Sequence, residues 1–310
     1  MSESKNCVVV FGPGRSGTSL GMKLLEASGL RLSAELEPAS RDNPTGHYED
    51  VRICKAQQRL MTSIGLYPLL PRPEHWKSAP AYSETKQELK NIVKEEVNRD
   101  RRLWGFKDPR TCVFWPLWED IFKELQVIPK SVFCVRPSNS TVSSLMKAYN
   151  LPQDLSEGIL LYRSLHALRD LQGQNVCFVH YDRWQTDPVP QLKALTTYCG
   201  LANTATDFEA IARGNIRPEL NRESGNDLRL SSSLVELDRL LASCDGSSYD
   251  ADRLETWCHS LTKSMDDLGF VLKGVDRLYR MNGRRLFHAA ETKRGRLARI
   301  KAAVRQWLGR

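Results

Sequence analysis

The feature that most constrains this chain is a glycine-rich turn between a short apolar run and an amphipathic segment. Cys7–Phe11 is a continuous run with three valines, which predicts a buried strand. The turn Gly12-Pro13-Gly14-Arg15-Ser16-Gly17 follows, and the leucines of Thr18–Ser28 then recur at helical spacing until Gly29. Glycines there permit a tight turn whose N–H groups face an anion at a helix N-terminus. This order of elements predicts an α/β fold with an anion site at the first helix.

Apolar runs and helical patterns alternate through the first two-thirds of the chain. Three further runs predict strands, at Leu103–Phe106, Ser131–Val135 and Asn175–His180. Helical patterns occur at Asp50–Met61, Ser83–Arg99, Asn139–Tyr149, Ser156–Leu171 and Val189–Tyr198. Such alternation is typical of a parallel, doubly wound sheet flanked by helices, whose ligand binds at the carboxyl ends of the strands.

The last third of the chain has helical patterns and no strong strand. Ser231–Leu241 and Asp252–Leu268 are the clearest of these patterns, so we expect a helical C-terminal region that covers the sheet. The chain has 310 residues, the length of one α/β domain. We predict one domain over 1–290, with a P-loop-like sheet core in about 1–200 and a helical elaboration in about 201–290, followed by a tail at 291–310.

The composition favours a soluble protein of a reducing compartment. Hydrophobic residues make up 41% of the chain and charged residues 26%, as is usual for globular proteins. We find no signal-peptide pattern and no run long enough to span a bilayer. The eight cysteines form no CxxC pair and lie mostly in apolar segments. We therefore expect free thiols, no metal site and a cytoplasmic location.

The positive charge of the chain is concentrated at its C-terminus. The net charge is +8, and Lys293–Arg310 holds seven Lys/Arg residues and no acid. The rest of the chain is therefore close to neutral, which argues against a nucleic-acid partner. In the tail, Leu297, Ile300, Val304, Trp307 and Leu308 recur at helical spacing. This pattern predicts peripheral contact with the inner face of a membrane, with an ordinary packing helix as the alternative.

The glycine turn is compatible with three classes of ligand. Gly12, Gly14 and Gly17 match the dinucleotide pattern GxGxxG, but the acidic residue expected about 20 residues later is not cleanly placed. The turn also nearly matches the P-loop GxxxxGK[ST]. Thr18 occupies the position of the P-loop lysine, which argues against a nucleoside triphosphatase. The third class is a nucleotide with a phosphosulfate end.

The segment Arg15-Ser16-Gly17-Thr18-Ser19 resembles the 5'-phosphosulfate loop of the sulfotransferases that use 3'-phosphoadenosine 5'-phosphosulfate (PAPS). In that family a basic residue precedes Ser-Gly-Thr and lies against the 5'-phosphate and the sulfuryl group. The resemblance implies that Arg15 has this role and that the four residues after it supply hydroxyl and amide groups. A glycine turn with a solvated arginine is the alternative.

A second motif separates the three ligand classes. Arg136 follows the predicted strand Ser131–Val135, and Ser144 lies eight residues later in a predicted helix. The 3'-phosphate motif of the same family has this arginine and serine at this spacing. The two groups can converge on one phosphate by charge-assisted hydrogen bonds, each worth about 1.5–3 kcal/mol. Adenosine with a 3'-phosphate needs this second anion site, whereas ATP and NAD do not.

Three shorter segments resemble the bacterial-type members of the family. They are Asn43-Pro44-Thr45-Gly46-His47-Tyr48-Glu49, Trp104-Gly105-Phe106-Lys107-Asp108-Pro109-Arg110 and Val179-His180-Tyr181-Asp182. The last of these implies that Tyr181 lies near the adenine, with a half-buried strand tyrosine as the alternative. The late glycine-rich loop of animal cytosolic members has no counterpart, and Arg217, Arg222 and Arg229 stay open as substitutes for it.

Transfer of a sulfuryl group needs cations near the leaving oxygen and a base for the acceptor hydroxyl. We assign Arg15 and Lys107 as the cations. Animal cytosolic members place a histidine two residues after the lysine, but this chain has Pro109 there. Glu49 is the first candidate base, since glycan-modifying relatives use a carboxylate in a comparable loop.

Asp108 is the second candidate base and His47 the third. Glu49 also fits a structural role as a helix N-terminal charge, and Asp108 fits one as an N-cap or as a partner of Arg110. No metal-ligand constellation is visible in the sequence.

The sequence therefore predicts a PAPS-dependent sulfotransferase that acts on a hydroxyl-bearing acceptor. A bacterial envelope glycan or glycolipid is the preferred acceptor, and a small natural product is the alternative. A kinase-like nucleotide-dependent transferase and a catalytically inactive nucleotide-binding relative are the rival functions.

Overall fold

A computed structural model describes residues 5–263 except for 41–42, 44–45, 67–71, 74, 202–205 and 218–227. The chain divides into two compact units, Met1–Cys258 and His259–Arg310, and the description below concerns the first. The predicted tail at 291–310, its boundary at residue 290 and the membrane contact assigned to it lie outside the described residues. None of the described helices is both long enough and apolar enough to cross a bilayer.

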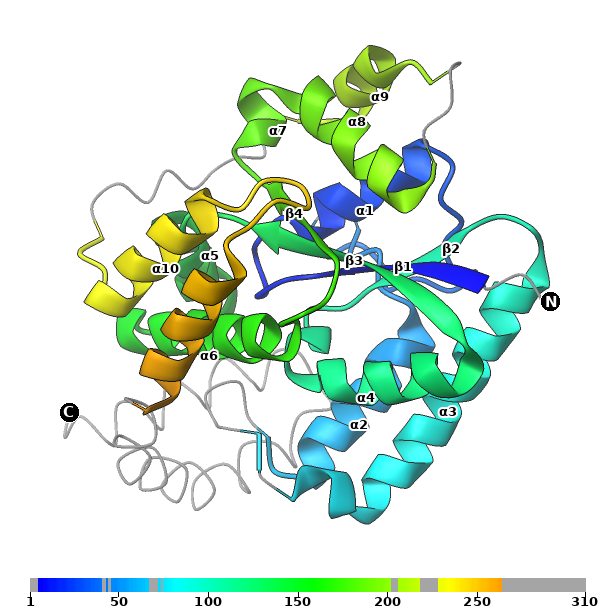
Figure 1. The fold of residues 1–310 in the computed structure, drawn as a ribbon, viewed down its shortest axis with the longest axis horizontal. Coiled ribbons are helices and arrows are strands. Elements are labelled where there is room, and N and C mark those ends of the chain that lie inside the picture. Colours follow the sequence, from blue (N-terminus) through cyan, green and yellow to red (C-terminus); the bar gives the residue numbers. More distant parts are fainter. Residues whose placement is uncertain are drawn as a thin grey trace. The chain divides into compact units, whose positions relative to one another are not determined.

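Four parallel strands form the sheet at the centre of this unit (Figure 1). They are β1 (Lys5–Phe11), β2 (Trp104–Lys107), β3 (Val127–Val135) and β4 (Val176–His180). Their order is β2-β1-β3-β4, and all three pairings are parallel. The chain crosses from β1 to β2 in one direction and returns past β1 to β3, so the order reverses beside β1. Open α/β sheets bind ligands at such a switch point, at the carboxyl ends of the strands.

Helices cover both faces of the sheet, which confirms the predicted α/β class (Figure 1). One group is α1 (Thr18–Ala27), α7 (Arg183–Thr186), α8 (Pro188–Cys199) and α9 (Phe208–Asn215). A second group is α2 (Val51–Ser63), α3 (Pro80–Arg99) and α4 (Thr111–Leu125), with the 3-10 turn η1 (Trp76–Ser78). Beside β4 lie α5 (Ser138–Tyr149), α6 (Gln153–Asp170) and α10 (Ser232–Ala242).

The strands are apolar because both of their faces are covered. Val8, Val9 and Val10 of β1 are completely buried, as are Val132 and Phe133 of β3. Parallel strands that are buried on both faces read as continuous apolar runs, which is why the sequence predicted all four of them. Phe11 stacks on Trp115 of α4 with ring centroids 5.0 Å apart, so the end of β1 packs directly against this helix.

The sequence patterns did not predict α4, although it packs against β3. Its sequence contains Pro116, a residue that usually ends or kinks a helix. The backbone is non-helical at Phe114, where φ is −116° and ψ is 15°. The proline therefore stands near the start of a second helical stretch, where its missing N–H is not needed. Thr111 and Cys112 form the first turn, directly after the end of β2.

The C-terminal part of this unit is helical, as the sequence predicted. α10 falls on the predicted Ser231–Leu241. A helix that begins at residue 251, where Asp252–Leu268 was predicted, ends this unit and continues along the chain to residue 263 in the second unit. Asp238 of α10 accepts hydrogen bonds from the backbone N and the Oγ of Ser138, at 3.0 and 2.6 Å. Ser138 begins α5, so α10 supplies an acidic cap to the helix that carries Ser144.

A buried polar network fixes α6 against the segment before η1. The Tyr162 hydroxyl accepts the backbone N–H of Arg72 at 2.5 Å, and Arg72 pairs with Asp170 at 2.8 Å. Arg169 Nη2 lies 3.0 Å from Nδ1 of His166. A guanidinium only donates, so Nδ1 accepts and Nε2 donates its proton to the Tyr162 hydroxyl. His166 is therefore neutral. Burial is the main cause that holds its pKa well below the ordinary value, and the positive charges of Arg72 and Arg169 lower the pKa further.

This network predicts acid destabilisation near neutral pH. The unfolded chain takes up a proton at His166 below pH of about 6.5 and the folded chain does not, so stability falls as pH drops. The free energy of unfolding should lose about 1.4 kcal/mol per pH unit for this one proton. Denaturant unfolding between pH 7 and 5 measures the slope.

The substitution His166→Gln should lower the pH dependence of the free energy of unfolding by the contribution of one proton. His180, whose pKa burial also lowers, still contributes to that dependence. His75→Gln replaces an exposed histidine outside this network and is the control for the substitution itself. An unchanged slope in His166→Gln would contradict the neutral assignment.

Candidate functional site

The loop between β1 and α1 has the geometry of an anion-binding turn. Gly17 is the N-cap of α1, with φ 89° and ψ 13°, and Arg15 has φ 73°, so two residues of the loop are left-handed. The N–H of Ser16 donates to the carbonyl of Pro13 at 3.2 Å, which closes the turn. A Cβ on Gly12 would lie 2.7 Å from the carbonyl oxygen of Cys134, so only glycine fits beside β3.

Ser16 supplies the observation that points most directly to a ligand. The residue is 1% exposed, and its Oγ has no hydrogen-bond partner among the described residues. Buried hydroxyls are nearly always hydrogen-bonded, and leaving one unpaired costs about 1–3 kcal/mol. The first residue of α1, Thr18, is also buried. An anion at this helix N-terminus would accept from the Ser16 hydroxyl and from the free N–H groups of the first turn.

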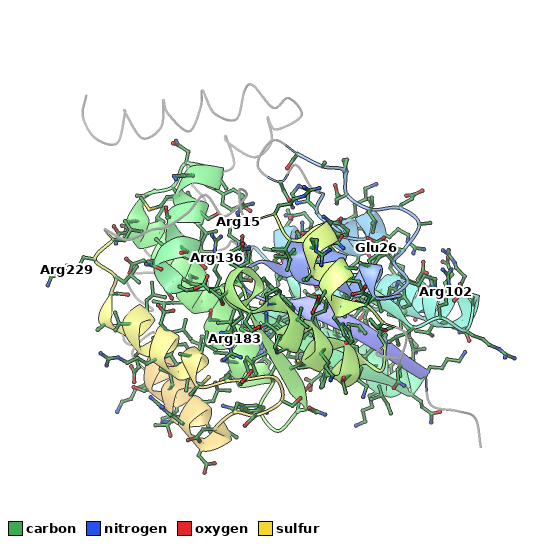
Figure 2. The ribbon with its side chains drawn as sticks, turned by 90° about the horizontal axis from the view of Figure 1, so that it is seen from above. Arg15, Glu26, Arg102, Arg136, Arg183 and Arg229 are labelled. Atoms are coloured by element: carbon green, nitrogen blue, oxygen red, sulfur yellow. The ribbon has the colours of Figure 1, made fainter. Side chains whose placement is uncertain are left out.

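The structure joins this loop to the second predicted motif. Arg15 Nε donates to Ser144 Oγ at 3.0 Å, and Arg136 Nη1 donates to the carbonyl of Arg15 at 3.2 Å. Figure 2 shows Arg15 and Arg136 close to one another, in agreement with their hydrogen bond. The two motifs lie more than 120 residues apart in the sequence and form one polar cluster at the ends of β1 and β3.

Tyr181 closes this cluster on the side of β4. Its N–H donates to the carbonyl of Val135 at 2.7 Å, and its ring lies 4.5 Å from the guanidinium carbon of Arg136. A Cβ on Gly17 would lie 2.4 Å from Cδ2 of this ring, so Tyr181 packs directly on the loop. The arginine and serine motif, the tyrosine and the glycine loop thus meet in one cluster.

A second cluster surrounds Lys107 at the end of β2. Lys107 is 3% exposed, and its Nζ donates to Glu49 Oε1 at 2.5 Å and to the carbonyl of His47 at 3.1 Å. Ser19 Oγ lies 3.5 Å from Nζ and donates to the same His47 carbonyl at 3.2 Å. Asn43 Nδ2 donates to Ser19 Oγ at 3.2 Å. The loop before α2 therefore delivers Glu49 to Lys107, and Ser19 links this cluster to α1.

Glu49 is held as a carboxylate. Burial alone would raise its pKa, but the ammonium of Lys107 and the guanidinium of Arg110, 3.6 Å away, outweigh burial and lower the pKa. The thiol of Cys54 donates to Glu49 Oε2 at 3.3 Å. Asp50, the next residue, is the N-cap of α2 and accepts from the N–H groups of Arg52 and Ile53.

The other two candidate bases are engaged elsewhere. Asp108 is completely buried and accepts from the backbone N of Arg110 at 2.8 Å and from its Nη1 at 2.7 Å. This is the structural contact with Arg110 that the sequence also allowed. His47 Nε2 lies 2.9 Å from Ser40 Oγ, and its carbonyl binds Lys107. Among the three candidates, Glu49 makes the direct side-chain contact with Lys107.

Glu49, Cys54 and Asp108 also form a grouping of the kind that binds metals. One ligand atom from each lies within 4.8 Å of the others. The two carboxylates are already bound to Lys107 and Arg110, so a metal ion would face two protein cations at short range. We therefore describe these residues as an ion-pair network.

Some of the site was not assigned from the sequence. Arg110 and Asn43 lie inside the quoted segments, but no spacing rule indicated that they orient Glu49 and Ser19. Within the described residues, no side-chain hydrogen bond or ion pair joins Arg217 or Arg229, two of the open substitutes for the glycine-rich loop, to either cluster. Arg229 is exposed and extends away from Arg15 and Arg136 (Figure 2), Arg217 is exposed, and Arg222 lies outside the described residues.

The packing of Tyr181 on the loop predicts the cost of a methyl group at residue 17. Gly17→Ala adds backbone strain at positive φ, about 1–3 kcal/mol, and also a collision with the ring. Gly29→Ala is the matched control, because φ there is 102° and nothing lies within 4 Å of the added Cβ. Denaturant unfolding should show a larger loss for Gly17→Ala than for Gly29→Ala.

The difference between these two variants should shrink in a Tyr181→Ala background, because the ring that causes the collision is gone. Equal losses for the two glycine substitutions in the unmodified protein would contradict the contact.

Comparisons with known proteins return similar structures only. No family model matches the chain, and no curated protein matches it. One similar structure is the sulfotransferase domain of the olefin synthase of Synechococcus PCC 7002, with 16% identity, 84% of this chain and 97% of that chain covered, and a TM-score of 0.44. Another is the sulfotransferase STF9 of Mycobacterium avium, with 15% identity, 69% and 68% covered, and a TM-score of 0.45. A third is the sulfotransferase domain from the curacin biosynthetic pathway, with 13% identity, 84% and 99% covered, and a TM-score of 0.40.

Proposed function

We propose that this chain is a sulfotransferase that moves a sulfuryl group from PAPS to an acceptor hydroxyl. The observation that carries the proposal is the joined pair of anion motifs, in which Arg15 bonds Ser144 and Arg136 bonds the backbone of Arg15. A nucleotide with phosphates at both its 5' and 3' ends requires two anion subsites a short distance apart. The glycine loop provides the first, and the end of β3 with the start of α5 provides the second.

The donor fits the residues that are present. The unpaired Ser16 hydroxyl and the N-terminus of α1 would hold the 5' end, with Gly17, Thr18 and Ser19 in the same turn. Arg136 and Ser144 would hold the 3'-phosphate. Arg15, which the resemblance assigned to the 5' end, would join them there, because its Nε donates to Ser144. The exposed part of the Tyr181 ring, already stacked on Arg136, offers a face to the adenine.

The chemistry belongs to the Lys107 cluster. The acceptor oxygen forms a bond to sulfur, the bond from sulfur to the bridging oxygen of the 5'-phosphate breaks, and the acceptor proton passes to Glu49. Lys107 stabilises negative charge on the leaving oxygen. Because the pKa of Glu49 is lowered, the base stays ionised well into the acid range.

A kinase-like function has less support. Thr18 stands in place of the lysine that binds the β- and γ-phosphates in P-loop enzymes, and it is buried at the first position of α1. The second anion subsite at Arg136 and Ser144 has no role with ATP. An inactive binding protein is the other rival, and a transfer assay with labelled PAPS distinguishes it.

The acceptor class is part of the proposal. A hydroxyl on a glycan or glycolipid is supported by the resemblance of residues 43–49 to bacterial-type members of the family and by the basic amphipathic sequence of 293–310. Transfer of label from PAPS to extracted glycans, lipids and small metabolites identifies the class. Label found only in small metabolites would contradict this choice.

The paired motifs predict selective binding of adenosine 3',5'-bisphosphate. Its affinity should exceed that of 5'-AMP by about 10- to 150-fold, the equivalent of one charge-assisted bond to the 3'-phosphate. Arg136→Gln should remove most of this ratio. Any loosening of the loop through the lost bond to the Arg15 carbonyl lowers the affinity of both nucleotides and so does not change the ratio. Titration calorimetry measures both ligands. Arg183→Gln is the control, because that arginine is partly exposed and pairs with Asp245. Equal affinities of the unmodified protein for adenosine 3',5'-bisphosphate and 5'-AMP would contradict the proposal.

The Lys107 cluster predicts a separation of rate from binding. Lys107→Ala should lower kcat far more than it lowers the affinity for adenosine 3',5'-bisphosphate. Glu49→Gln should lower kcat by about 10²- to 10⁴-fold. Breaking a buried ion pair also costs about 3–5 kcal/mol of stability, so each variant is assayed below its unfolding transition.

The matched control for the base is Asp108→Asn, which should lower kcat less than Glu49→Gln because Asp108 contacts Arg110 and not Lys107. The reverse order of effects would move the base to Asp108. In the unmodified protein, the acid limb of the pH profile should lie below the ordinary carboxylate range, since the pKa of Glu49 is lowered.

A further inference from the structure

An arginine from α6 reaches the glycine loop and is not part of any motif. Arg163 lies in the second half of α6, and its Nη1 is 2.9 Å from the position that a Cβ on Gly14 would occupy. The residue is partly buried. It therefore places a guanidinium against the loop at Gly14. Gly14 precedes Arg15 in the sequence, whereas Gly17, which Tyr181 contacts, follows it.

Arg163 is not used to hold the fold together. Within the described residues its guanidinium makes no hydrogen bond and no ion pair, whereas Arg169 and Arg72, which also lie on or against α6, both bind Asp170. Burying part of an unpaired cation is unfavourable unless an anion compensates it. The charge is felt nearby, because Arg163 acts against the burial that raises the pKa of Cys112, in the first turn of α4.

The helix holds this side chain in place. Tyr162 precedes Arg163 directly, and His166 follows one turn later, and both belong to the buried network that binds Arg72. α6 packs against α4 and α5, the helices that begin after β2 and β3. Arg163 is thus delivered to the loop from a rigid element and not from a surface segment.

At Gly14, the absence of a side chain is explained by the position of Arg163. Its φ is not in the positive range, so the backbone does not require glycine there, in contrast to Gly17. The atom that a Cβ would meet is Nη1 of Arg163. The missing side chain leaves room for this guanidinium beside the loop.

We propose that Arg163 binds the phosphate at the 5' end of the donor nucleotide, from the Gly14 side of the loop. The inference rests on the proposed function and deepens it. Arg15 Nε is committed to Ser144, in the 3' subsite, so the loop needs a cation from elsewhere for its own anion. Arg163 and the unpaired Ser16 hydroxyl then face the same phosphate, together with the N-terminus of α1.

Three nucleotides separate the two subsites. The ratio of the dissociation constants of 3'-AMP and adenosine 3',5'-bisphosphate reports the 5'-phosphate, and the ratio for 5'-AMP and the bisphosphate reports the 3'-phosphate. Arg163→Gln should lower the first ratio by about 10- to 150-fold and leave the second unchanged. Arg136→Gln should do the opposite. Arg163→Lys keeps the charge and should restore part of the first ratio.

A substitution at Gly14 tests the contact itself. Gly14→Ala should displace the flexible end of Arg163 and lower the same ratio. In the Arg163→Gln background it should cost much less, since the contact is already gone. Arg239→Gln removes an exposed arginine of α10 and is the control for the change in net charge. Circular dichroism verifies that each variant is folded. If Arg163→Gln does not fold, Arg163→Lys serves as the test in its place.

The outcomes distinguish the inference from the proposed function. If the unmodified protein discriminates both phosphates and the 5' ratio does not change in Arg163→Gln or Arg163→Lys, the role of Arg163 is wrong and the proposed function stands. If the bisphosphate binds no better than 5'-AMP, the 3' subsite and the proposed function fail. The ratio for 3'-AMP and the bisphosphate, measured with and without Arg163→Gln, still tests the role of Arg163. If it binds no better than 3'-AMP, both are overturned.

Discussion

The candidate site depends on the link between the ends of β1 and β3. Arg136, at the end of β3, donates to the carbonyl of Arg15 and so fixes a residue that has a positive φ without being glycine. Such a conformation is unfavourable for an isolated residue, and the surrounding contacts must maintain it. The Arg15 side chain in turn reaches Ser144. Two strands that are neighbours in the sheet therefore carry two motifs that are far apart in the chain, and one arginine belongs to both.

Much of this arrangement was accessible from the sequence because the physics behind it is local. The strands are buried on both faces and read as apolar runs, and the loop needs glycine where φ is positive at Gly17 and where β3 approaches Gly12. The spacing of Arg136 and Ser144 reflects one strand end and nearly two turns of the following helix. Because parallel strands end at the same edge of a sheet, these motifs had to meet.

The remainder required long-range contacts that no spacing rule contains. α4 was missed because Pro116 interrupts its pattern, although the proline stands where a helix tolerates it. Arg163 has no local signature, since one arginine on a helix reads as a solvated residue. Its relation to Gly14 exists only because α6 packs against α4 and α5 and so brings this side chain to the loop. The choice among Glu49, Asp108 and His47 likewise turned on which side chain meets Lys107, a contact between residues 58 positions apart.

The two clusters treat their cations differently, and the difference fits separate roles in the proposed reaction. Lys107 is almost fully buried and is neutralised by Glu49, so its charge is tolerated in the resting protein. When Glu49 accepts the acceptor proton, its carboxylate loses its charge, and the ammonium of Lys107 is no longer compensated. The full positive charge then becomes available as the leaving oxygen becomes negative. An interaction that strengthens only as the transition state forms raises kcat without tightening ground-state binding. Arg163 has no such partner among the described residues, so it attracts an anion before any chemistry begins and suits a role in binding.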